Sequence, residues 1–240
     1  MTSGNLFCLQ LAQALGNRRL VILRIAITAL LALPFILVGM PARAQAGGIV
    51  MVILFTSFFG AAVGFARLSA EKRLECLMLL PTSHGLIWLD LVLSSVFVRL
   101  IPVVVVLAGF IAVNGKEITP ASLISLAGML CMSMLLLTLL GIVAGRLSRS
   151  NGEVHLFGAI ICIILAVISG IMPLPERLKL LTVTAAWNPI ARLLTALMRL
   201  ANGEMVISWT ELVLTSIVLI AFAAITLQRL ISGGSPKQNA

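Results

Sequence analysis

Six long apolar runs, separated by short polar segments, set the pattern of this chain. A helix needs about 20 apolar residues to cross the hydrocarbon core of a bilayer, and each run meets or approaches that length. Pro34 and Pro102 fall inside two of the runs, which packed membrane helices tolerate. We therefore expect six transmembrane helices, at about Leu20 to Met40, Gly48 to Leu68, Leu86 to Val113, Ala121 to Gly145, Val154 to Met172 and Val206 to Ile231.

Three further segments are not plain spans. Residues 1–19 place leucines at roughly helical spacing among polar neighbours, which is typical of an amphipathic helix lying on the membrane surface. Residues 69–85 form a short polar insert. Residues 173–205 are too polar to span and too apolar for an open loop, so we expect one or two short helices packed at the outer surface, divided near Asn188 and Pro189.

The predicted fold is therefore all-α, a polytopic membrane protein with one domain over residues 1–240. Its expected parts are a surface helix (1–19), spans one and two (20–68), an insert (69–85), spans three to five (86–172), an outer segment (173–205), span six (206–232) and a tail (233–240).

Composition and charge support this interpretation. The chain is 60% hydrophobic and 10% charged, with a mean hydropathy of +1.16, whereas soluble domains carry about 25% charged residues. The net charge of +9 does not indicate nucleic-acid binding, because the basic residues form no face interleaved with aromatics. With a cytoplasmic N-terminus, ten of the 17 basic residues lie inside and the short outer loops hold only Arg43 and Lys116. The positive-inside rule then predicts that both termini are cytoplasmic, in a cytoplasmic (inner) membrane.

Catalytic and metal-binding motifs are missing from the sequence. The only Gly-Lys pair, Gly115-Lys116, has no glycine five residues before it, so the chain has no phosphate-binding loop. The four cysteines form no C-x-x-C pair, and the sulfur-rich stretch from Met129 to Met134 is better explained by packing than by copper binding. We expect no enzyme activity, metal or cofactor in this chain itself.

Two charged residues fall within the third run. Asp90 and Arg99 are nine residues apart, about 900° around a helix, and so lie on opposite faces and do not pair with each other. We place Asp90 near the cytoplasmic headgroups. Arg99 is deeper, where an ionised residue is costly and often functional. It can snorkel to the headgroups, pair across helices or face a substrate path.

Two glycine pairs have the spacing of close helix contacts, Gly60 with Gly64 and Gly141 with Gly145, although this spacing also arises by chance.

The polar insert is the most informative segment. Residues 71–80 can form a short helix, which Pro81 would end. On that helix one side is apolar and another carries two acids four residues apart. The insert can be a plain linker, but its apolar side is better suited to a docking surface. The residues concerned are Glu71, Arg73, Leu74, Glu75, Leu77, Met78 and Pro81.

This insert also carries a family resemblance. The run E-K-R-L-E-C-L-M-L-L-P-T-S, Glu71 to Ser83, resembles the segment between spans two and three in type-2 ATP-binding-cassette (ABC) exporter permeases. A second similarity lies in S-G-I-M-P-L-P, Ser169 to Pro175, followed by Trp187 to Arg199. The order of these motifs, the span count and the long outer segment extend the resemblance over nearly the whole chain.

The resemblance implies a role for each part. Residues 1–19 would be a connecting helix, and Glu71 to Leu80 a coupling helix that docks on a separate ATPase subunit. The outer segment, with Pro173, Pro175, Asn188 and Pro189, would be a re-entrant hairpin. The implied partners are an ABC ATPase that holds ATP and Mg²⁺, a second permease subunit as homodimer or heterodimer, and membrane lipid.

The chain departs from the family pattern in two places. The outer S-G-I-M-P-L-P run is compressed, and Asp90 stands where a basic residue is common. The run L-E-C-L-M-L-L-P also resembles haem-exporter B-subunit permeases, which usually lack the long outer segment and so rank second.

Two other classes of function stay open from the residues alone. One is a secondary transporter or channel driven by an ion gradient, which normally needs buried titratable groups or broken helices at mid-membrane. The other is a membrane assembly scaffold that transports nothing. The sequence does not identify a substrate.

Overall fold

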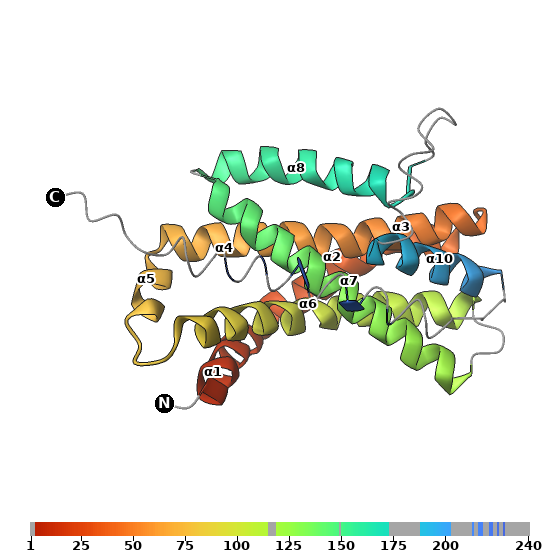
Figure 1. Ribbon diagram of the computed structural model, residues 1–240. Coiled ribbons are helices and arrows are strands. Elements are labelled where there is room, and N and C mark those ends of the chain that lie inside the picture. The colour runs from red at the N-terminus through yellow and green to blue at the C-terminus, as the bar shows by residue number, and fades with distance from the viewer. Residues whose placement is uncertain are drawn as a thin grey trace.

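The computed structural model describes residues 3–114, 119–148, 150–172 and 188–202, with isolated positions between Val213 and Gln228. All regular secondary structure in these residues is helical, as the apolar pattern predicts. The helices form an elongated bundle in which α5 and α1 lie at one end and α10 at the other (Figure 1). The elements are α1 (Ser3–Gly16), α2 (Arg18–Leu37), α3 (Ala42–Leu54), the π-helical turn η1 (Phe55–Phe59), α4 (Gly60–Ala70), α5 (Arg73–Met78), α6 (His84–Asn114), α7 (Pro120–Leu147), α8 (Asn151–Ile168) and α10 (Pro189–Ala201).

Four helices in the described residues are long and apolar enough to cross a membrane. They cover Arg18–Leu37, Ala42–Ala70, His84–Asn114 and Pro120–Leu147, and they match the first four predicted spans. The fifth predicted span coincides with α8, a shorter apolar helix. Most of the sixth, Val206 to Ile231, lies outside the described residues, so the count of six stays a prediction.

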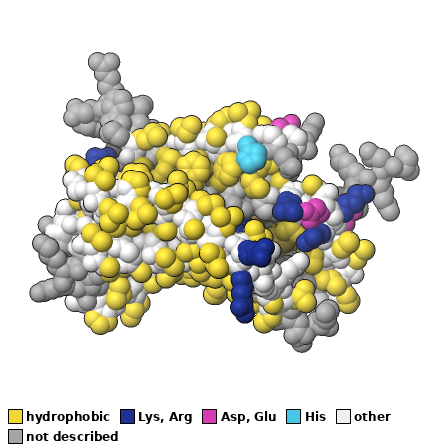
Figure 2. Space-filling model, turned by 180° about the vertical axis from the view of Figure 1, so that it is seen from behind, with side chains coloured by type: hydrophobic (Ala, Val, Ile, Leu, Met, Phe, Trp, Pro, Cys, Tyr) yellow, Lys and Arg dark blue, Asp and Glu magenta, His cyan; other side chains and the backbone are white. Residues whose placement is uncertain are grey.

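The surface of the bundle is apolar where lipid would cover it. On α2, the side chains of Ile22 and Leu30 are 65% and 68% exposed, which is costly in water and favourable in hydrocarbon. Figure 2 shows a largely hydrophobic face on which most of the visible basic side chains gather toward one end of the molecule. These features indicate a membrane-embedded protein.

A π-helical turn interrupts the second span. The chain runs as a continuous helix from Ala42 to Ala70, but Phe55–Phe59 widens to π geometry. Such a turn inserts an extra residue and changes which side chains face each neighbour; it is frequent at functional sites. The apolar pattern gave no sign of it, because a one-residue shift in a uniformly apolar run leaves the composition unchanged.

Helices α4 and α7 come into backbone contact. A Cβ atom on Gly141 would collide with the carbonyl oxygen of Phe58 and lie 2.7 Å from the Cβ of Ala61. A Cβ on Gly145 would meet the carbonyl oxygen of Ala62. The predicted close contact at Gly141 and Gly145 is therefore confirmed: the backbones of the two helices touch because glycine leaves room.

The second glycine pair has a different role. Gly60 and Gly64 face the side chain of Arg99, which comes from α6. The prediction of a close helix–helix contact at this pair is wrong, because the space that the missing side chains leave is filled by a guanidinium group and not by a helix backbone.

Helices α1 and α10 flank the bundle. Helix α1 ends at Gly16 and packs on α6, where Phe7 and Phe97 form an edge-to-face ring pair at 5.6 Å. At the other end, the side chain of Asn188 accepts a hydrogen bond from the Ile190 amide at 3.0 Å and caps α10. A helix thus begins at Pro189, where the sequence analysis divides the outer segment; residues 173–187, on the other side of that division, lie outside the described residues. Helix α10 buries its leucines against α3 and α7, while Pro173 and Pro175 lie outside the described residues.

We expect Gly141→Ala to destabilise the bundle. The added methyl group meets backbone atoms that cannot move aside, and overpacking of this kind costs about 1–3 kcal/mol. The apparent melting temperature in detergent should fall by roughly 2–4 °C for each kcal/mol.

Gly109→Ala is the matched control, because its Cβ would lie at an ordinary 3.7 Å from Ile36. Equal melting temperatures for the two variants would contradict the tight α4–α7 contact.

Candidate functional site

Arg99 is turned inward, toward α4. Its Nη2 donates a hydrogen bond to the carbonyl oxygen of Gly60 at 2.6 Å, and its Nη1 donates to the Ser95 carbonyl at 2.8 Å and also to the Ser95 hydroxyl. Of the three possibilities that the sequence left open, the structure shows a contact across helices, and the acceptors are neutral oxygens. No carboxylate pairs with Arg99 in the described part of the chain.

Glycines make the space that Arg99 occupies. A Cβ on Gly60 would stand 2.8 Å from the Arg99 Nε, and one on Gly64 would stand 3.3 Å from its Nη2. Gly60 also directly follows the π-helical turn. The turn and the two glycines together present a backbone carbonyl to the guanidinium at close range.

A cavity of about 950 Å³ surrounds this site. Its walls come from α1, α2, η1, α4, α5, α6 and α7. Three arginines line it, Arg24, Arg73 and Arg99, and none of the described residues that line it is acidic. Arg24 is close enough for its positive charge to act on Arg99. Sequence analysis did not assign Arg24 to this site, because it lies among the basic residues that flank the first span.

Asp90 does not take part in this site. Its side chain is 8% exposed, lies between Trp88 and Leu91 on α6, and has no ion pair or hydrogen bond within the described residues. The prediction that Asp90 and Arg99 do not pair is confirmed. The ring of Trp88 stacks on that of Phe65 with 5.6 Å between the ring centroids, and Phe65 lines the cavity.

The predicted helix from Glu71 to Leu80 is shorter in the structure. Helix α4 ends at Ala70, and Lys72 adopts a left-handed conformation with φ of 56°. An L-residue in this conformation cannot continue a right-handed helix. The chain therefore turns before α5 begins at Arg73, and Glu71 stands at the corner between the two helices.

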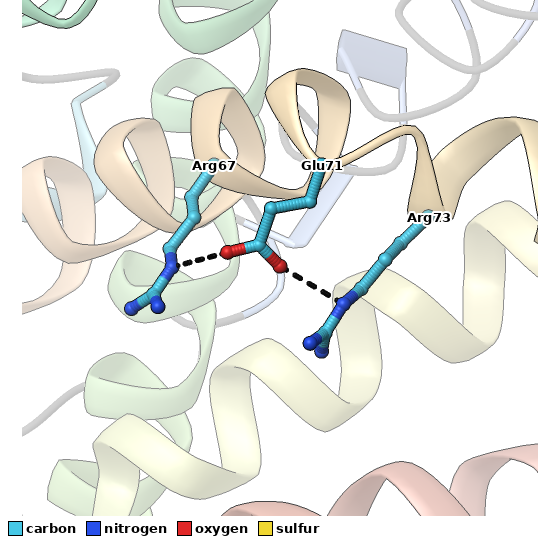
Figure 3. A network of polar contacts seen from close by, with 3 residues as sticks. All are labelled: Arg67, Glu71 and Arg73. Carbon is cyan, nitrogen blue, oxygen red and sulfur yellow. Dashed lines mark hydrogen bonds and ion pairs between the residues drawn. The ribbon is translucent and has the colours of Figure 1, made fainter.

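Glu71 joins α4 to α5 electrostatically. Its carboxylate pairs with Arg67 at 2.7 Å and with Arg73 at 2.9 Å (Figure 3). The hydrogen bond from Arg67, with the positive charges of Arg73 and Arg67, lowers the pKa of Glu71 below its ordinary value of 4.5. Sequence analysis assigned Glu71 and Arg73 to a docking segment, and in this structure the two residues pair with each other.

The apolar side of α5 faces its own protein. Leu74, Leu77 and Met78 are partly buried against a cluster that includes Phe65, Trp88 and Leu139. Leu79, which follows the helix, is 84% exposed. Glu75, Cys76 and Pro81 are exposed beside it.

No group of three or more potential metal ligands occurs in the described residues. The four cysteines, Cys8, Cys76, Cys131 and Cys162, are unpaired thiols, and Cys162 is buried.

Comparison with known proteins finds no matching family model, no matching curated protein and no matching solved structure.

We expect the stability of the turn between α4 and α5 to depend on pH through the ionisation of Glu71. Because the pKa of Glu71 is lowered in the folded protein, its stabilisation is fully present above the ordinary value of 4.5 and is lost as pH falls through the lowered pKa. Hydrogen exchange over residues 71–80, corrected for intrinsic exchange rates, should show constant protection from about pH 7 to about pH 5 and a loss below that.

Glu71→Gln should show the weaker protection already at neutral pH. The control is Glu75→Gln, since Glu75 has no ion pair in the described structure. Wild-type protection in Glu71→Gln at neutral pH would contradict the bridging role.

Proposed function

We propose that this chain is the membrane permease subunit of an ABC exporter, driven by ATP hydrolysis in a separate ATPase subunit. The observation that carries the proposal is α5, a short helix between two long apolar helices at one end of the bundle (Figure 1), built from the segment that resembles the coupling helix of such permeases. The ATPase would supply ATP and Mg²⁺, since this sequence has no phosphate-binding loop.

Helix α5 is attached to the bundle in a way that would transmit force. Leu74, Leu77 and Met78 pack against residues of α4, α6 and α7, among them Phe65, Trp88 and Leu139. Glu71 ties the same helix to the end of α4. A push on α5 would therefore be shared by three membrane helices, because packed side chains transmit displacement with little compression.

The same helix also borders the cavity. Arg73, Cys76 and Leu77 from α5, and Leu80 after it, line the cavity together with Arg99. Movement of α5 would change the shape of the cavity, which is the coupling that an alternating inward and outward arrangement requires.

The docking contacts should come from the exposed edge of α5. Leu79 is the largest exposed apolar side chain beside the helix, with Glu75 and Pro81 as polar and rigid neighbours. Leu74, Leu77 and Met78, which the sequence favoured as anchors, would instead hold α5 on the permease. A coupling helix needs two such surfaces, one that packs on the permease and one that contacts the ATPase.

The remaining parts of the proposal follow the charge pattern and the resemblance. The permease would pair with a second copy or a related permease subunit in the cytoplasmic membrane, with both termini and α5 on the cytoplasmic side.

The rival function, a transporter or channel driven by an ion gradient, has less support. Asp90 is the single acidic residue in the four described spans, and it lies outside the cavity lining. A proton- or sodium-coupled site normally places titratable groups on the transport path.

We expect Leu79→Asp to weaken binding of the ATPase while the permease still inserts and folds. Truncation of a central interface anchor costs about 2 kcal/mol or more, so affinity should fall at least about 30-fold. Pull-down of the ATPase encoded with this chain, and its ATPase activity in nanodiscs, are the measurements.

Leu147→Asp is the matched control. Leu147 is 72% exposed at the end of α7, on the same predicted side of the membrane. Wild-type association and turnover in Leu79→Asp, or an equal loss in Leu147→Asp, would overturn the assignment of α5.

A further inference from the structure

The cavity carries more positive charge than the described residues neutralise. Arg73 is paired with Glu71, but the acceptors of Arg99 are neutral oxygens. Arg24 has no ion pair in the described structure, and its charge repels that of Arg99. Two guanidinium groups that have no carboxylate partner in the described structure thus border one cavity.

Arg99 keeps hydrogen-bonding capacity for a ligand. Each terminal nitrogen of a guanidinium carries two N–H groups. Nη1 is occupied by the carbonyl and hydroxyl of Ser95, whereas Nη2 donates only to Gly60 within the described residues. One N–H of Nη2 therefore has no acceptor from the described chain. A phosphate or carboxylate oxygen is the acceptor that arginine binds most strongly.

Most of the remaining cavity lining is apolar. Four helices contribute apolar side chains to it: Leu9, Ile27, Phe65, Leu91 and Val98. Its 950 Å³ lies within the range of pockets that enclose a drug-sized ligand. The hydroxyl groups at Thr28 and Thr56 are turned to carbonyls of their own helices. A small hydrated anion would leave most of this surface without a partner, whereas an alkyl chain would cover it.

We infer that the cavity binds an amphiphilic anion, with its phosphate or carboxylate group at Arg24 and Arg99 and its alkyl chain along the apolar wall. Such a molecule can come from the bilayer, as an acidic phospholipid, or from the cell interior, as a free single-chain amphiphile. In both cases the ligand presents an anionic group and an alkyl chain to the cavity. The inference does not depend on the ATPase, because binding needs only this chain.

The test is equilibrium binding of radiolabelled dodecyl phosphate to the purified full chain in neutral dodecyl maltoside. Wild-type protein should bind it saturably, with one site for each chain. Inorganic phosphate and a dodecyl trimethylammonium cation should compete at least about tenfold more weakly, since one lacks the chain and the other the negative charge. Equal competition by the cation would overturn the inference.

A charge-matched pair of variants locates the site. Arg24→Gln with Arg99→Gln should weaken dodecyl phosphate binding at least about tenfold, a loss typical of removing a charge-assisted contact. Arg18→Gln with Arg19→Gln removes the same net charge from exposed positions outside the cavity and should bind as wild type. Equal binding by both variants would overturn the inference.

Arg24→Gln alone covers the case in which the cavity double variant does not fold. Arg24 is exposed, and its replacement should still reduce affinity several-fold. Unchanged affinity would remove Arg24 from the site and contradict the inference.

Native mass spectrometry of the chain extracted from its membrane separates the two sources. An acidic phospholipid that co-purifies with wild type, and is lost from the Arg24 and Arg99 variant, assigns the ligand to the bilayer. Dodecyl phosphate binding without such a lipid assigns it to a free amphiphile. Because no ATPase is present, failure here is distinct from failure of the docking test.

Discussion

The hydrogen bond from Arg99 to the Gly60 carbonyl is the interaction on which the centre of this structure depends. An ionised side chain inside an apolar bundle must find polar partners, and Arg99 finds them in a backbone carbonyl of α4 and in Ser95 of its own helix. The carbonyl is within reach because Gly60 and Gly64 have no side chains. Side chains at these two positions would force the guanidinium away from α4.

Helix α4 consequently has two unlike faces. On one face, Ala61 and Ala62 meet Gly141 and Gly145 of α7 at backbone contact. On the other face, Gly60 and Gly64 border the cavity that holds Arg99. The tight face fixes α4 and α7 as one unit, while the open face leaves space between α2, α4 and α6. Helix α5 follows α4 and is joined to it by the ion pairs of Glu71. A force on α5 would therefore displace both the α4–α7 pair and the wall of the cavity.

The apolar pattern predicted the first four membrane helices to within six residues at each end, because span length and hydropathy are set by the bilayer. It also predicted the close helix contact at Gly141 and Gly145, since a glycine pair at helical spacing permits backbone contact. The start of α5 was not predictable, because it depends on the left-handed backbone conformation of Lys72. Helix propensities do not indicate such a conformation at a lysine. The acceptor of Arg99 was equally hidden: it is a backbone carbonyl, brought into place by a π-helical turn in a uniformly apolar run.

The central claim is that a positively charged cavity, which attracts anionic groups, lies between these helices. Val98 lines this cavity, whereas Val105 is exposed on the same helix, does not line it and serves as the control. In a cysteine-free background, Val98→Cys should react with an anionic methanethiosulfonate reagent about tenfold faster than with a cationic one of similar size, as expected for a local positive potential of about 1 kT per unit charge. This preference should disappear when Arg24 and Arg99 are replaced by glutamine. Equal rates for the two reagents at position 98, or a preference that survives loss of both arginines, would contradict the account.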